Sequence, residues 1–147
     1  MAEHNLIGTI GEDFAVQILK QNRLRIRERN WHIGHLEVDI IAENRKEIVF
    51  VEVKTRTSTF GGKRAEEYVD ERKRCRIIAA ANAYIRYHNI QKSPRFDIVG
   101  ILLDRNTHKV VEQTYLPDAF APRCKTIGNN NSFSGIWRWL HRNKIIR

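Results

Sequence analysis

Hydrophobic residues recur along the chain with two different periods, which predict both helices and strands. Over residues 6–20 they fall at helical spacing, with Glu12 close to the edge of the apolar stripe made by Ile7, Ile10, Phe14 and Ile18. A second helix is predicted over residues 65–88, with an inner face that includes Val69, Ile77, Ala81, Tyr84 and Ile85. Runs rich in β-branched residues predict five strands, at residues 24–31, 36–42, 47–54, 95–103 and 109–116.

The order of these elements predicts the fold class. The second and third strands are separated by a short polar turn at residues 43–46, which is typical of a β-hairpin. One helix, three strands, a second helix and two more strands predict an α/β protein, with a mixed sheet flanked by helices.

The end of the chain differs from the rest. Beyond Asp118 it has no acidic residue, and the Asn-rich segment 128–135 resembles a flexible linker. We therefore expect one domain over residues 1–122, followed by a basic C-terminal extension over residues 123–147. Four residues of this extension are candidate nucleic-acid contacts, by charge or by stacking on bases: Trp137, Trp139, Arg138 and Arg142. The alternative is that the tryptophans pack on the protein's own surface.

Net charge points to a polyanionic partner. Lysine and arginine outnumber aspartate and glutamate by 26 to 17, which gives a net charge of +9. No run of about 18 apolar residues is present, so no membrane span is predicted. The N-terminus lacks the layout of a signal peptide, and we expect a cytoplasmic protein. The isolated Cys75 and Cys124 predict reduced thiols rather than a zinc site.

The predicted hairpin carries acidic residues among apolar ones. If Asp39 and Glu52 are cross-strand neighbours, their negative charges repel each other, and a divalent cation such as Mg²⁺ would relieve that repulsion. Lys54 follows Glu52 by two residues, so it lies on the same face of its strand. The alternative is an exposed sheet face with solvated charges, which the spacing alone does not exclude.

The motifs resemble those of a known family. Val38-Asp39 followed by Glu52-Val53-Lys54 is similar to the PD-(D/E)xK nuclease signature. A longer series of motifs resembles the YraN family of uncharacterised bacterial proteins, which is related to archaeal Holliday-junction resolvases. The segments that carry this resemblance are GTIGE at 8–12, NW at 30–31, EVDIIA at 37–42, FVEVKTR at 50–56, FG at 60–61 and RFD at 95–97.

The resemblance implies a restriction-endonuclease-like fold and a set of site residues. The family's metal ligands fall on Glu12, Asp39 and Glu52, and Lys54 completes the catalytic set; the cofactor would be Mg²⁺ or Mn²⁺. Arg56 and Lys73 are candidate phosphate contacts, with solvated charges as the alternative. Two positions depart from the pattern, Val38 where proline is usual and Leu36 where glycine is usual. Glu37 is either an outer residue of the site or a partner for an arginine, and Arg95 is expected to pair structurally with Asp97.

The resemblance implies a metal-dependent nuclease that hydrolyses phosphodiester bonds in DNA, with branched or damaged DNA as one substrate class. The alternative is a nucleic-acid-binding module that keeps the fold without catalysis, and RNA remains a further substrate class. Relatives among the resolvases suggest a homodimer.

Overall fold

The computed structural model describes residues 2–58 and 69–122. Its elements follow the order α1 (Ala2–Gln21), β1 (Arg25–Ile33), β2 (Leu36–Glu43), β3 (Glu47–Thr57), α2 (Glu71–Tyr87), β4 (Ser93–Leu103) and β5 (Val110–Phe120). The predicted extension, residues 123–147, with its four candidate contacts, lies outside the described residues.

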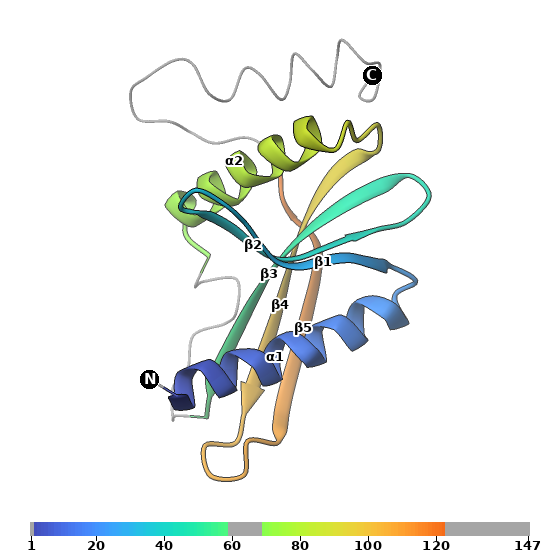
Figure 1. Ribbon diagram of the computed structural model, residues 1–147. Coiled ribbons are helices and arrows are strands. Elements are labelled where there is room, and N and C mark those ends of the chain that lie inside the picture. The colour runs from blue at the N-terminus through green and yellow to red at the C-terminus, as the bar shows by residue number, and fades with distance from the viewer. Residues whose placement is uncertain (1, 59–68, 123–147) are drawn as a thin grey trace.

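The strands form one five-stranded sheet in sequential order, from β1 to β5. All neighbours are antiparallel except β3 and β4, which are parallel because the chain returns through α2 between them. Figure 1 shows the two helices on either side of this sheet. The arrangement confirms the predicted α/β restriction-endonuclease-like fold, a mixed sheet flanked by helices.

Two apolar layers hold the helices against opposite faces of the sheet. Ile40 packs in the layer under α1, whereas the next residue, Ile41, packs in the layer under α2. In the α2 layer, Tyr84 meets the ring of Phe50 edge-on, and Phe50 stacks on Phe96 with centroids 5.7 Å apart. The strands at the centre of the sheet are covered on both faces, which explains their nearly continuous apolar runs.

Element boundaries differ from the predicted ones where local hydrogen bonds decide them. The second helix begins only at Glu71, because Asp70 caps it by accepting a hydrogen bond from the backbone amide of Lys73 at 2.8 Å. β4 begins at Ser93, two residues before the predicted start, and β5 continues to Phe120. Both extensions follow strand pairing rather than the composition of the added residues.

Cys75, in α2, is disulfide-bonded, so the prediction of a reduced thiol is wrong for this residue. Cys124 lies outside the described residues.

Two buried acidic residues belong to the framework rather than to a site. Glu43 is 3% exposed and pairs with Arg25, Arg27 and Lys92. Burial alone would raise the pKa of Glu43, but hydrogen bonds from these three cations outweigh it and lower that pKa to about 2.

The second buried acid, Asp97, is held in a network of its own. Arg95 donates two hydrogen bonds to its carboxylate, at 2.9 and 2.8 Å, and Tyr115 donates another at 2.5 Å. The expected structural pairing of Arg95 with Asp97 is confirmed.

α1 packs tightly against β3 at Gly11. A Cβ atom built on Gly11 would lie 1.7 Å from Oγ1 of Thr55, whereas one built on Gly8, a turn earlier, would meet no atom within 4 Å. Gly11 therefore lets the helix lie directly against the strand, and this close approach places the next residue, Glu12, beside the sheet.

We predict opposite effects for alanine at the two glycines. Gly11→Ala should lower the free energy of unfolding by roughly 1–3 kcal/mol, because Thr55 or the helix must shift. Gly8→Ala should leave it unchanged or raise it by up to about 1 kcal/mol, because alanine favours the helix. Urea unfolding of the two variants checks this, and equal stability of both would contradict the close approach.

Candidate functional site

The sheet divides at the point where the candidate acids lie. The β2–β3 ladder ends at the pair Ile40 and Val51, while β2 stays paired with β1 as far as Leu36 and β3 stays paired with β4 as far as Thr57. Figure 1 shows the β1–β2 hairpin diverging from the second half of β3. The two strands thus form a fork, with Asp39 and Glu52 next in sequence beyond its last paired residues.

Asp39 spans the opening of this fork. Its Oδ2 atom accepts a hydrogen bond of 2.8 Å from the backbone amide of Val53. Burial raises the pKa of its carboxyl group to about 8, and the negative charge of Glu52 contributes to that rise; the Val53 hydrogen bond acts in the opposite direction. The negative charges of Asp39 and Glu52 therefore repel each other, as the sequence predicts for cross-strand neighbours.

Glu52 is buried, with two ammonium groups beside it. Its Oε1 atom lies 3.5 Å from Nζ of Lys54, on the same strand, and 3.5 Å from Nζ of Lys73, on α2. Lys73 also lies 3.7 Å from Oε1 of Glu37. The structure thus brings Lys73 to the acidic residues.

Glu37 itself is half exposed and contacts His32, with 3.2 Å between Nε2 and Oε2, as well as Lys73. Its partners in the described part of the chain are therefore a histidine and a lysine, not the arginine that the sequence suggested.

Glu12 approaches the same region from α1. Its Oε2 atom accepts a hydrogen bond of 3.1 Å from the side-chain amide of Asn30 and lies 3.5 Å from Arg29. The charge of Glu12 adds to the rise in the pKa of Asp39, so the two carboxylates interact electrostatically. Within residues 2–58 and 69–122, however, no three acidic, histidine or cysteine side chains converge closely enough to hold a metal ion together.

The neighbours of Glu12 do not follow from sequence spacing. Asn30 has a φ of 50°, the left-handed conformation that asparagine tolerates better than most residues. This conformation falls inside β1, where sequence alternation predicts only extended backbone. The one signal in the sequence is the place of Asn30 among the family-like motifs.

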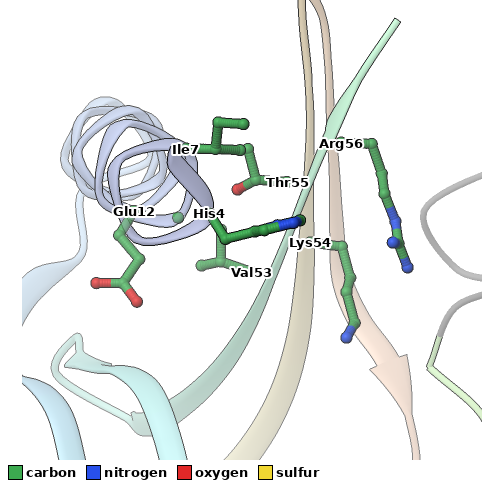
Figure 2. Close-up of a pocket in the computed structure, with 8 residues that line it drawn as sticks. His4, Ile7, Glu12, Val53, Lys54, Thr55 and Arg56 are labelled. Atoms are coloured by element: carbon green, nitrogen blue, oxygen red, sulfur yellow. The ribbon is translucent and has the colours of Figure 1, made fainter. Parts of the chain in front are cut away.

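A cavity of about 240 Å³ adjoins these groups. It lies between α1 and the unpaired edge of β3, and its walls include Glu12, Lys54, Thr55 and Arg56. Figure 2 shows Lys54 and Arg56 extending from β3 and Glu12 extending from α1. The candidate phosphate contact Arg56 thus belongs to the wall of this cavity.

The comparisons with known proteins agree with the sequence motifs. Residues 11–101 match the family described as "Uncharacterised protein family UPF0102". The chain belongs to this family, the YraN family. The expected resemblance is therefore confirmed at the family level.

Similar UPF0102 proteins occur in several bacteria. One from Bacteroides thetaiotaomicron is 39% identical over 122 residues, which is 82% of this chain and all of that protein. One from Parabacteroides distasonis is 41% identical over 125 residues, 85% of this chain and all of that protein. One from Flavobacterium johnsoniae is 40% identical over 124 residues, 82% of this chain and 98% of that protein. UPF0102 relatives thus match most of this chain, including its acidic hairpin.

Among the described residues, neither α1 nor α2 is long and apolar enough to span a membrane.

We predict that Asp39→Asn stabilises the metal-free protein at pH 7. The pKa of Asp39 is about 4 in the unfolded chain and is raised to about 8 in the folded state. The folded protein therefore loses stability as the pH rises from about 4 towards 8. Asparagine avoids this loss and can still accept the Val53 hydrogen bond. The gain should exceed about 1 kcal/mol at pH 7 and shrink towards zero at pH 4. Thermal melts in a chelator at both pH values check this; a gain that does not depend on pH would contradict it.

We predict that the backbone conformation and the side chain of Asn30 make separate contributions to stability. Asn30→Ala should cost about 1 kcal/mol of stability, because alanine has a Cβ atom but no polar side chain to support the left-handed conformation. Asn30→Gly relieves the backbone and should remain closer to the wild type, although it too lacks the hydrogen bond to Glu12. Urea unfolding of both variants distinguishes the two contributions, and equal losses would show that the φ value costs nothing.

Proposed function

We propose that this UPF0102 protein is a metal-dependent nuclease that hydrolyses phosphodiester bonds in DNA, with branched or damaged DNA as a substrate class. The observation that carries the proposal is the pair of mutually repelling carboxylates, Asp39 and Glu52, at the open fork of the sheet. When both carboxylates are ionised they repel each other, and a bound divalent cation would relieve that repulsion and favour their ionised forms.

The donor set fits a hard divalent cation. Mg²⁺ is commonly held by one or two carboxylates together with waters and substrate phosphates, and so does not require three converging side chains. We assign Asp39 and Glu52 as direct ligands of Mg²⁺ or Mn²⁺. Glu12, held by Asn30 and Arg29, is assigned to the same site as an acceptor for metal-bound water. When bound, the ion would supply an activated water and positive charge at the phosphate.

The protein's own cations complete the proposed chemistry. Lys54 and Lys73 both lie beside Glu52 and partly neutralise it. With an ion bound at the carboxylates, the ammonium groups of Lys54 and Lys73 would be available to contact the phosphate. Lys54 is therefore assigned to the catalytic set, and Lys73 to holding the substrate from α2.

The competing function is a nucleic-acid-binding module without catalysis, which the net charge of +9 would support equally well. The two functions differ in what metal does to the protein. An ion that binds only the folded state raises its stability, by about 2.7 kcal/mol at a concentration of 100 Kd.

We predict that millimolar Mn²⁺ raises the midpoint of thermal unfolding and supports cleavage of linear, nicked, flapped or four-way DNA. Asp39→Asn and Glu52→Gln should abolish both effects, because each removes a proposed ligand. Glu112→Gln serves as the matched control, because Glu112 is exposed on β5 at the far edge of the sheet. DNA binding without a Mn²⁺ effect would favour the binding module, and a Mn²⁺ shift without cleavage would leave a metal-binding protein that is not a nuclease.

A further inference from the structure

Gly8 has no packing role that explains its place in the middle of α1. A glycine at an interior helix position costs about 1 kcal/mol relative to alanine. Gly11 has a steric reason, since Thr55 fills the space beside it, whereas a Cβ atom at Gly8 would meet nothing within 4 Å. Gly8 nevertheless lines the cavity between α1 and β3, so its missing side chain keeps that wall of the cavity open.

The cavity forms a groove that extends away from the acidic residues. His4, Gly8 and Glu12 are spaced four residues apart, so they follow one face of α1, and all three line the groove. Along the helix axis, Glu12 and His4 lie about 12 Å apart. This distance exceeds the ~3.4 Å axial rise of one nucleotide in a duplex strand, so the groove is longer than one nucleotide. Glu12 marks the end nearest the acids, and His4 lies two helical turns away.

Two basic residues of β3 border the groove opposite α1. Lys54 and Arg56 line the groove from β3, with side chains that extend on the side of the strand away from α1, whereas His4 reaches from α1 towards this strand (Figure 2). Side chains of this kind contact the phosphates of nucleic acids, and a glycine lets a backbone approach closely. The walls contain no phenylalanine, tyrosine or tryptophan among the described residues, so this groove offers contacts to phosphate rather than a surface for base stacking.

We propose that this groove binds the nucleic-acid backbone next to the bond that is cut, with the strand passing over Gly8 between His4 and Arg56. The inference rests on the proposed function and adds to it a second binding position, which fixes the path of the substrate strand. Gly8 contributes by the absence of a side chain, at a cost in helix stability.

The test uses a larger side chain at position 8. Gly8→Met should fill part of the groove and weaken binding of a fluorescein-labelled duplex roughly tenfold, measured by anisotropy in a chelator so that no cleavage occurs. The slope of log Kd against log salt should fall by about one for each phosphate that the variant no longer neutralises. Thermal stability should equal or exceed that of the wild type, because methionine favours a helix over glycine. If Gly8 had a purely structural role, Gly8→Met would lower stability together with DNA affinity. Lower DNA affinity with unchanged stability therefore supports the groove.

Thr9→Met is the matched control. Thr9 is the next residue on α1 and is exposed, so the same bulk there lies outside the groove and should leave affinity and salt slope unchanged. If Gly8→Met binds DNA as the wild type does, the groove proposal is overturned while the nuclease proposal stands, because the Mn²⁺ shift and cleavage are measured separately. If the wild-type protein binds no DNA in the chelator, the groove proposal fails, and the nuclease proposal is still judged by the Mn²⁺ shift and by cleavage. An equal loss in Thr9→Met would also overturn the groove.

Discussion

The hydrogen bond from the backbone amide of Val53 to the carboxylate of Asp39 is the interaction on which the candidate site depends. Beyond Ile40 and Val51, the two strands no longer share a ladder, and the amide of Val53 would lack its usual strand partner. The side chain of Asp39 supplies an acceptor there, so the strands can separate without burying an unsatisfied donor. The same hydrogen bond holds Asp39 close to Glu52, which links the shape of the fork to the repulsion within it.

Neutralisation of this repulsion requires parts of the chain that are distant in sequence. Lys54 comes from the same strand as Glu52, but Lys73 comes from α2, and Asn30 and Arg29 hold Glu12 from β1. The electrostatic balance of the site therefore exists only when both helices are docked on opposite faces of the sheet. Holding these acidic side chains together lowers the stability of the fold and creates a site that attracts positive charge. Such a loss of stability is common at functional positions.

The fold is largely predictable from the sequence because its main elements have clear periodicity. The α1 stripe and the β2–β3 hairpin are local patterns, and both lie close to their predicted positions. The start of α2 differs from the prediction because it depends on a single capping bond at Asp70. The proximity of Asp39 to Glu52 follows from pairing across a short turn. The positions of Lys73 and Asn30 depend instead on helix docking and on one left-handed residue, which no spacing rule reveals.

The arginines of β1 show that not all of the positive charge faces a partner. β1 is an edge strand, paired only with β2 in the described sheet, and such an edge can recruit a strand from another molecule. Arg25, Arg27 and Arg29 alternate along it, and each pairs with an acidic residue of its own chain. Charged side chains along an edge disfavour addition of a further strand. Part of the chain's basic character thus protects against edge-to-edge aggregation, and it would do so whether or not nucleic acid is present.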